Sequence, residues 1–266
     1  IALAVAAIPE GLPIVATLAL ARGMIKMARH HVIIKRLSAV ETLGGTNVIC
    51  ADKTGTLTKN KIEVTKIVAT SEEAKTIIDK VSVLCNTAEI YTKGEEQKEI
   101  GDPLEIGLLR FAEKNGINIE ELRTLNPKIN EEPFSSETKI MATEHRNGKE
   151  LTVYAKGAAE ELLARCSHIL EKGNEISLKD EKRKHWLKEA HHLAASGLRS
   201  IAAAYKTPTG TSASLDSDLV FIGLIGMMDP PREDVYKAID ECHAAGIKVV
   251  MITGDHPATA KNPARM

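Results

Sequence analysis

The feature that most constrains this fold is a short apolar run followed at once by an acidic, threonine-rich turn. Residues 46–51 read Thr-Asn-Val-Ile-Cys-Ala, which is typical of a buried parallel strand. The next seven residues, Asp52–Thr58, read Asp-Lys-Thr-Gly-Thr-Leu-Thr. Ligands of open α/β sheets bind outside the carboxyl ends of the strands, so this order turns the Asp52 carboxylate toward a ligand. The sequence therefore predicts an α/β fold with a functional site at residue 52.

The chemistry of this turn suits a phosphate group. Gly55 lets the backbone approach a phosphate closely, and Thr54 and Thr56 supply hydroxyl and amide donors. The Asp52 carboxylate can attack a γ-phosphorus and form an aspartyl-phosphate. The alternative is an ordinary hydrophilic turn, which would account for an isolated Asp-x-x-Gly but not for the whole heptapeptide.

A second apolar run, near the carboxyl end, repeats this order. A helical pattern at 233–245 closes with Gly246, and residues 247–252 form another apolar, β-branched stretch. That stretch leads directly into Thr-Gly-Asp at 253–255. The repeat predicts a second strand that ends in a phosphate-binding loop.

The amino-terminal segment differs in kind from the rest of the chain. Ile1–Ala21 carries a single charge, Glu10, in an apolar run about long enough to cross a bilayer. Two prolines and a glycine within Pro9–Pro13 interrupt the helical hydrogen bonds and free carbonyl oxygens beside that carboxylate, an arrangement typical of an ion site. Residues 22–36 are basic and contain no acid, as expected for a cytoplasmic flank. A soluble helix hairpin is the alternative for this segment.

Composition limits the partners. With 266 residues the chain can form two domains with their own cores. It carries 35 basic and 36 acidic residues, so its balanced charge predicts no nucleic-acid partner. Its four cysteines are dispersed, which favours reduced thiols over a disulfide or zinc framework.

Between the two phosphate loops, helical and strand patterns interleave, which predicts an α/β or α+β class. The predicted strands are 62–68, 151–155, 198–205 and 219–228, and the predicted helices are 72–90, 103–114, 160–165 and 180–196.

The heptapeptide Asp52–Thr58 resembles the phosphorylation signature of P-type cation-transporting ATPases. The resemblance implies that Asp52 is phosphorylated, that Lys53 and Thr54 belong to the catalytic site, and that Asp52 and Thr54 hold Mg²⁺. Residues 1–44 resemble the fourth transmembrane helix and stalk of type II pumps. In those pumps the glutamate of Pro-Glu-Gly-Leu-Pro, here Glu10, coordinates the transported cation, and the motif is most similar to that of calcium pumps.

The same family implies a nucleotide-binding domain in the middle of the chain. In this comparison Phe134 stacks on adenine, Glu105 hydrogen-bonds near the base, Lys156 with Gly157 forms the pocket floor, and Arg199 approaches the phosphates. Lys139 is a further cation in that neighbourhood. From the residues alone, Phe134 could instead be core, Lys156 could cap a turn, and Glu105 and Arg199 could be solvated surface.

The resemblance also predicts the domain organisation and a hinge. The expected fold is a partial dehalogenase-like (Rossmann-like) phosphorylation domain with an inserted α+β nucleotide-binding domain. The expected parts are a transmembrane segment at 1–21, stalk and phosphorylation domain at 22–59, nucleotide-binding domain at 60–229, and returning phosphorylation domain at 230–266.

Near the return, Asp229-Pro230-Pro231-Arg232 resembles the family's second hinge, and Asp229 and Arg232 are expected beside the nucleotide. Thr253 and Gly254 resemble the second phosphate-binding motif. Asp255 is expected to organise that loop.

Three positions depart from the family pattern: Ser136 stands in place of arginine, Ala159 in place of proline, and Pro263 within an expected helix. No downstream Gly-Asp-Gly-x-Asn-Asp motif follows residue 255. The expectation is an internal fragment of a pump that binds ATP with Mg²⁺ but turns over poorly without the remaining domains of its parent.

Two alternatives remain at this stage. One is a soluble dehalogenase-like phosphatase with a large cap, and the other is a non-catalytic nucleotide-binding fragment. Thr54 disfavours the phosphatase, because that class usually carries a second aspartate as general acid at this position.

Overall fold

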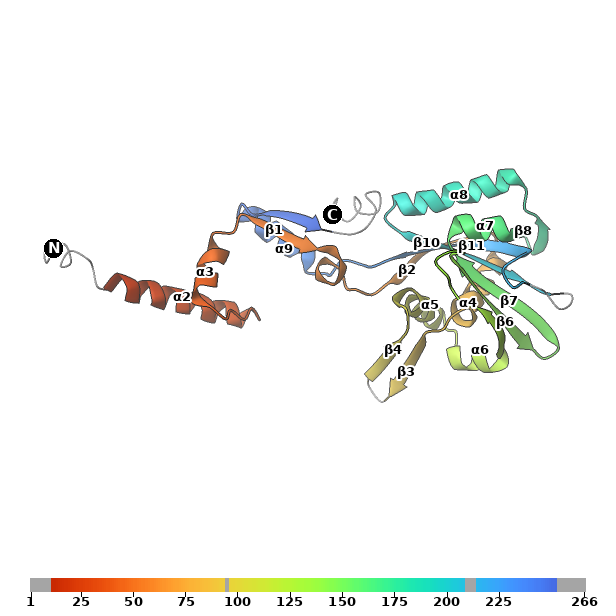
Figure 1. The fold of residues 1–266 in the computed structure, drawn as a ribbon, viewed down its shortest axis with the longest axis horizontal. Coiled ribbons are helices and arrows are strands. Elements are labelled where there is room, and N and C mark those ends of the chain that lie inside the picture. Colours follow the sequence, from red (N-terminus) through yellow and green to blue (C-terminus); the bar gives the residue numbers. More distant parts are fainter. Residues whose placement is uncertain (1–10, 94–95, 209–213, 253–266) are drawn as a thin grey trace. The chain divides into compact units, whose positions relative to one another are not determined.

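The computed structural model describes residues 11–93, 96–208 and 214–252, which fall into two compact units (Figure 1). One unit contains the residues up to Ala51 together with Asp234–Ile252, and the other contains Asp52–Glu233. Helices and strands alternate in both, so the predicted mixed α/β class is confirmed.

The first unit begins with two helices, α2 (Gly11–Arg29) and α3 (Leu37–Gly44). They contact each other where Gly23 faces Val40, and a Cβ at Gly23 would lie 3.1 Å from a Val40 methyl carbon. No residue of α2 is buried, and the helix is long and apolar enough to cross a membrane by length and composition alone. The predicted helix break begins within residues 1–10, and these, with Glu10, lie outside the described residues.

The same unit contains a two-stranded sheet, in which β1 (Val48–Asp52) pairs with β12 (Lys248–Ile252). Helix α9 (Val235–Ala244) contacts β12. The prediction that residues 46–51 form a buried strand is wrong for the described structure, because Val48 and Ile49 are 46% and 37% exposed. Among the described residues this sheet contains only β1 and β12, so β1 lacks the further strands that accompany an inner strand of a large parallel sheet.

The second unit is built on an eight-stranded sheet with the order β5-β6-β7-β10-β11-β8-β9, and β2 also pairs with β11. Its strands are β2 (Glu63–Ala69), β5 (Lys128–Glu132), β6 (Ile140–Asn147), β7 (Glu150–Gly157), β8 (Cys166–Glu171), β9 (Asn174–Ser177), β10 (Arg199–Lys206) and β11 (Leu219–Met228). Strand β11 is central, since it pairs antiparallel with β10 and β2 and parallel with β8.

Helices cover both faces of this sheet (Figure 1). One face packs on α4 (Glu72–Leu84), α5 (Pro103–Lys114) and α6 (Ile119–Leu125), and the other on α7 (Ala159–Arg165) and α8 (Asp180–Ala195). The alternating side chains of β11 divide between the two cores: Ile222 enters the first, and Phe221 enters the second against Trp186. This two-sided burial explains why the strand is a continuous apolar run.

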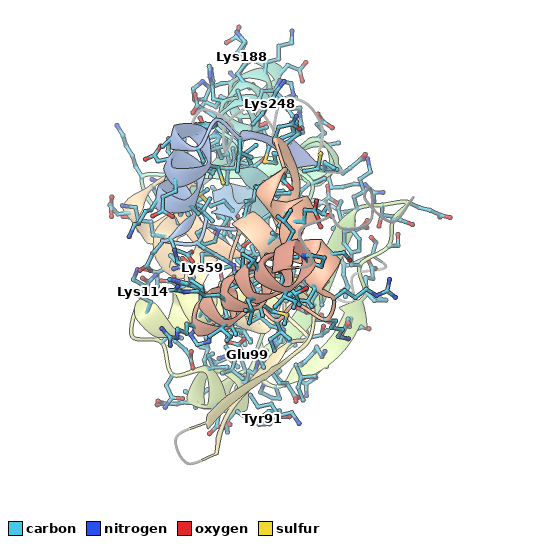
Figure 2. All side chains as sticks on the ribbon, turned by 90° about the vertical axis from the view of Figure 1, so that its left-hand side faces the viewer. Lys59, Tyr91, Glu99, Lys114, Lys188 and Lys248 are labelled. Carbon is cyan, nitrogen blue, oxygen red and sulfur yellow. The ribbon has the colours of Figure 1, made fainter. Side chains whose placement is uncertain are left out.

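Helix α4 ends at Leu84, so the prediction of a helix over 72–90 is wrong at its carboxyl end. Asn86 stops it: the side-chain amide donates to the Ser82 carbonyl at 2.8 Å, and the side-chain oxygen accepts from the Ala88 amide at 2.8 Å. Such local bonds compete with helical ones. The chain then enters a hairpin of β3 (Glu89–Lys93) and β4 (Glu96–Ile100), which carries Tyr91 and Glu99 (Figure 2).

Candidate nucleotide pocket and phosphorylation loop

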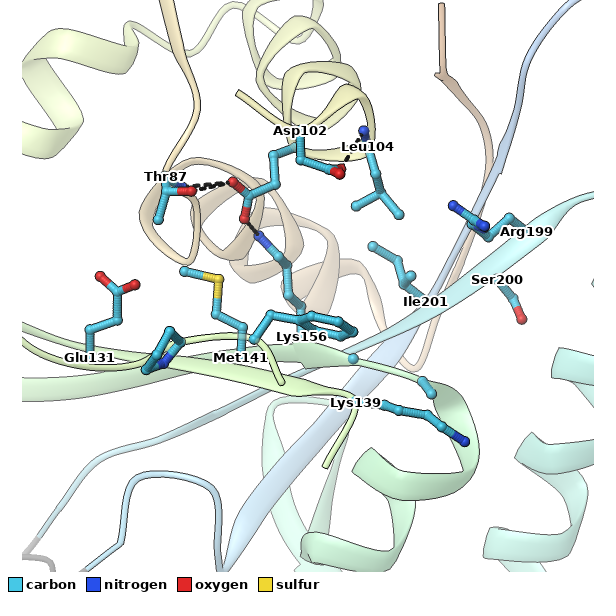
Figure 3. Close-up of a pocket in the computed structure, with 15 residues that line it drawn as sticks. Thr87, Asp102, Leu104, Glu131, Lys139, Met141, Lys156, Arg199, Ser200 and Ile201 are labelled. Carbon is cyan, nitrogen blue, oxygen red and sulfur yellow. Dashed lines mark hydrogen bonds and ion pairs between the residues drawn. The ribbon is translucent and has the colours of Figure 1, made fainter. Parts of the chain in front are cut away.

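The second unit contains a cavity of about 610 Å³ between the helical layer of α5 and the strands β6, β7 and β10 (Figure 3). Fifteen residues line it. Six of them are residues that the sequence predicted around the nucleotide: Glu105, Phe134, Lys139, Lys156, Gly157 and Arg199. Strand pairing and the first turn of α5 thus bring together side chains from four distant parts of the chain. Of the predicted hinge and loop residues, Asp229 and Arg232 are not among the lining residues of this cavity, and Asp255 lies outside the described residues.

The floor of the cavity is a buried ion pair. Lys156 Nζ on β7 lies 2.6 Å from Glu105 Oε1 on α5 and also donates to the Cys85 carbonyl. The two side chains are only 8% and 10% exposed, so neither is the turn cap or solvated surface residue of the alternative predictions. Burial by itself would raise the pKa of Glu105, but the Lys156 ammonium and hydrogen bonds from Lys156 and Thr87 outweigh it and lower that pKa. The carboxylate is therefore ionised at neutral pH.

Thr87 is a pocket residue that the sequence analysis missed. Its backbone amide and its hydroxyl both donate to Glu105 Oε2, at 3.0 and 2.6 Å. The prediction of an unbroken helix over 72–90 concealed it, although Asn86 is an unfavourable residue for a helix interior and indicated the break.

Phe134 is 62% exposed at the cavity, in the loop between β5 and β6. The alternative that it is a core residue is therefore wrong. Hydrogen bonds within the loop hold its shape, since the Lys139 amide donates to the Ser135 carbonyl at 2.8 Å and the Thr138 amide to the Ser135 hydroxyl at 3.1 Å. An exposed ring on an ordered loop offers a flat surface for a planar ligand.

Gly157 serves packing at the cavity edge. A Cβ at this position would lie 2.4 Å from the Lys139 carbonyl oxygen, which also accepts from the Ala158 amide at 3.0 Å. Lys139 itself has a positive φ of 52°. Its ammonium is half exposed and lies 3.7 Å from Glu161, so it is weakly held and accessible to a ligand.

Charge is distributed unevenly around the cavity. Figure 3 shows Lys139 and Arg199 at one end and Glu131 at the opposite end. Asp102 also lines the cavity, but its carboxylate caps α5 by accepting from the Leu104 amide at 2.8 Å. The cavity thus has a cationic end suited to an anionic group.

The loop after β1 is arranged differently. Asp52 is exposed, and the turn Lys53–Leu57 that follows contains Gly55 at φ 77°. The Thr58 hydroxyl donates to Asp229 Oδ2 at 2.5 Å, and Arg232 donates to the Gly55 carbonyl at 3.0 Å.

Asp229 and Arg232 therefore anchor the Asp52 loop, and neither lines the described cavity where the sequence analysis expected them. Their contacts follow from the bridge between Thr58 and Pro231, which places the Pro-Pro segment beside the loop.

The remaining predicted site residues, Thr253, Gly254, Asp255 and Glu10, lie outside the described residues. Within the described ranges no group of three or more His, Cys, Asp and Glu side chains could hold a metal ion. The exposed Asp52 and Thr54 still fit Mg²⁺, because that ion commonly takes one or two carboxylates and completes its shell with phosphate and water oxygens.

Comparison with known proteins agrees with this architecture. The family model described as P-type ATPase, cytoplasmic domain N, matches residues 76–234, which include every residue lining the cavity. The chain therefore belongs to the P-type ATPase family. Membership favours this family over the soluble dehalogenase-like phosphatase.

Individual relatives cover almost the whole chain. It is 39% identical to calcium-transporting ATPase 1 of Bacillus cereus and 40% identical to a calcium-transporting ATPase of Listeria monocytogenes, each over 98% of this chain. It is 39% identical to a probable cation-transporting ATPase F of Mycobacterium bovis. The chain spans about 30% of the length of these relatives, at 30%, 31% and 32%.

Proposed function

We propose that residues 60–229 form the nucleotide-binding domain of an ATP-driven cation pump and that the cavity binds ATP. The observation that carries the proposal is the cavity itself, in which an exposed aromatic ring, a buried ion pair and a cationic end surround one space. Adenine stacks on Phe134, its polar edge meets Glu105 and Lys156, and the phosphates extend toward Lys139 and Arg199.

Asp52 is the proposed nucleophile. A carboxylate oxygen attacks the γ-phosphorus, the bond from that phosphorus to the β,γ-bridging oxygen breaks, and ADP leaves with the bond electrons. Residues 22–59 and 230–266 then form the two parts of a dehalogenase-like phosphorylation domain around the inserted nucleotide-binding domain.

In that domain Lys53 and Thr54 follow the nucleophile in the catalytic loop, Thr253 and Gly254 bind the transferred phosphoryl group, and Asp255 organises their loop. Asp52 and Thr54 would hold Mg²⁺, which neutralises charge on the phosphates when it is bound.

The proposed transport step involves the amino-terminal segment. Residues 1–21 are a membrane-spanning part, and the apolar, unburied helix α2 supports this. Glu10 binds the transported cation, for which Ca²⁺ is the first candidate because two of the three relatives described above are named calcium-transporting ATPases. Residues 22–266 are cytoplasmic in this proposal, and the rest of the pump supplies the other ion ligands.

Nucleotide titration of the full chain tests the pocket. Removing the ring in Phe134→Ala should weaken ATP binding about 5- to 150-fold, since stacking of a base on an aromatic ring contributes about 1–3 kcal/mol. Tyr91→Ala is the matched control, because Tyr91 is exposed on the β3–β4 hairpin away from the cavity. Equal affinities of wild type and Phe134→Ala, measured by calorimetry, would refute the proposed adenine site.

Incubation with γ-labelled ATP and Mg²⁺ tests the nucleophile. Any label retained on the protein should be absent from Asp52→Asn, whose amide cannot form the acyl-phosphate. The 266-residue chain should turn over poorly. Rapid, Asp52-dependent ATP hydrolysis would show that the proposed dependence on further domains is wrong.

A further inference from the structure

We propose that Thr87 is a positioning residue: it holds the Glu105 carboxylate in the orientation that selects the base of the bound nucleotide. This inference rests on the proposed nucleotide-binding function and assigns a role to a residue that neither the sequence motifs nor the family resemblance indicated. It concerns the floor of the cavity, where the dashed lines in Figure 3 link Thr87 through a carboxylate to Lys156.

The two oxygens of the Glu105 carboxylate have different partners. Oε1 accepts from the Lys156 ammonium at 2.6 Å, and Oε2 accepts from both donors of Thr87, at 3.0 and 2.6 Å. Lys156 donates to one oxygen and Thr87 to the other, so rotation of the carboxylate plane would break the bonds to both residues. Hydrogen bonds to an ionised acceptor are stronger than neutral ones, which makes this orientation costly to change.

Thr87 is itself held by its neighbours. The Asn86 side-chain amide donates to the Glu105 carbonyl at 2.9 Å, which ties the loop to the start of α5. The Arg123 guanidinium, from α6, donates to the carbonyls of Val83 and Ala88, at 3.3 and 3.0 Å. The loop is thus fixed on both sides of Thr87 before any ligand binds, as a positioning role requires.

The hydrogen bonds at the cavity floor leave a countable number of donors and acceptors for a ligand. A carboxylate has about four lone-pair sites and an ammonium has three donors. Among the described residues, Thr87 and Lys156 occupy three of the sites on Glu105, and Cys85 and Glu105 occupy two of the donors on Lys156. One acceptor site on Glu105 Oε1 and one donor on Lys156 Nζ remain among these bonds, on atoms that lie 2.6 Å apart.

This pair fits the 6-amino edge of adenine. The exocyclic amine donates to Glu105, while a ring nitrogen accepts from Lys156. With the phosphates directed toward Lys139 and Arg199, hypoxanthine would instead place its 6-carbonyl oxygen against the Glu105 carboxylate, where two acceptors repel each other. The fixed carboxylate therefore discriminates ATP from ITP, and Thr87 keeps it fixed.

The test compares ATP and ITP dissociation constants for the full-length wild type, Thr87→Val and Thr87→Ser. Valine removes the hydroxyl at nearly constant shape. We expect ATP binding to weaken about 3- to 10-fold, the scale of one ordinary hydrogen bond, because the Thr87 backbone amide still donates to Glu105 Oε2. ITP binding should weaken less than ATP binding. The dissociation constant for ITP divided by that for ATP should therefore fall in Thr87→Val. Serine keeps the hydroxyl and should preserve the wild-type ratio.

A double-mutant cycle with Glu105→Gln decides whether Thr87 acts through Glu105. If it does, Thr87→Val has no further effect on the ratio in the Glu105→Gln background. Fluorescence of Trp186, the only tryptophan, checks that each variant is folded.

An unchanged ratio in Thr87→Val, or equal weakening of ATP and ITP binding, overturns the positioning role. Failure of the wild type to bind ATP would refute the proposed function instead.

Discussion

The proposed nucleotide pocket and the Asp52 loop each contain a carboxylate with a proposed role, but in opposite settings. Glu105 is buried beneath the pocket, paired with Lys156 and bonded to Thr87. Asp52 is exposed at the end of a two-stranded sheet, and the bonds around it fasten the loop backbone through Thr58 and Arg232.

In the proposed function, this difference separates recognition at Glu105 from reaction at Asp52. A buried, fully oriented carboxylate can discriminate between ligands, because any mismatch leaves a desolvated charge without a partner. An exposed carboxylate on a fastened loop keeps its hydration until a substrate approaches, and bonds from Thr58 and Arg232 hold the loop that carries it. The pocket is therefore preorganised in its side chains, and the Asp52 loop in its backbone.

The largest expected effect tests the difference between a buried and an exposed charge pair, by removing the charge that pairs with Glu105. Lys156→Met leaves the carboxylate buried without its partner and should lower the free energy of unfolding by about 3–5 kcal/mol. Lys139→Met is the matched control at the exposed pair with Glu161, where the loss should stay below about 1 kcal/mol. Denaturant titration followed by Trp186 fluorescence measures both, and equal losses would contradict the distinction between buried and exposed charge.

A second prediction compares apolar strand residues in the two units. Ile222 on β11 is fully buried, so Ile222→Ala should lower the free energy of unfolding by about 2–5 kcal/mol. Ile49 on β1 is 37% exposed, and Ile49→Ala should cost below about 1 kcal/mol.

Trp186 lies in the second unit against Phe221, so its fluorescence transition should shift for Ile222→Ala and stay in place for Ile49→Ala. A shift of similar size in both variants would mean that the two units unfold together.

The smallest expected effect is a pH dependence confined to the second unit. His145 is buried, with Nδ1 2.9 Å from the Asn126 carbonyl oxygen, and burial lowers its pKa below the ordinary 6.5. The unfolded chain therefore takes up the proton first. Stability should fall as pH drops below 6.5 toward the folded-state pKa, by at most about 1.4 kcal/mol per pH unit.

The variant His145→Gln should reduce this slope, and His168→Gln, at an exposed position, should keep it. Unfolding titrations between pH 5 and 7.5 would give the slopes. A wild-type slope that persists in His145→Gln would assign the effect to another group.

The sequence predicted four strands and four helices of the second unit, because their patterns are local, but it did not predict the β3–β4 hairpin or the strands β5, β8 and β9. The helix predicted at 103–114 and the apolar strand predicted at 219–228 have the bounds of α5 and β11. The six pocket residues could be grouped only through family resemblance, since strand order, which brings Lys156 against Glu105, is a long-range property.

The errors have equally physical causes. The helix predicted to residue 90 ends at Leu84, because Asn86 bonds the backbone better than another helical turn would. The strand at 46–51 was expected to be buried from its apolar composition, but composition does not specify what covers a strand. Thr87 was missed because a single threonine carries no pattern, and its role follows from the position of Glu105.

The pairing of β2 with β11 has a consequence for modularity. Glu63 is paired with Met228, so the strand that enters the large sheet and the strand that leaves it run side by side. Neighbouring strands lie only about 5 Å apart. The unit can therefore be inserted into a chain wherever two polypeptide ends lie at that spacing. A short turn could replace everything between them, or a different unit could be grafted there, without displacing the flanking polypeptide.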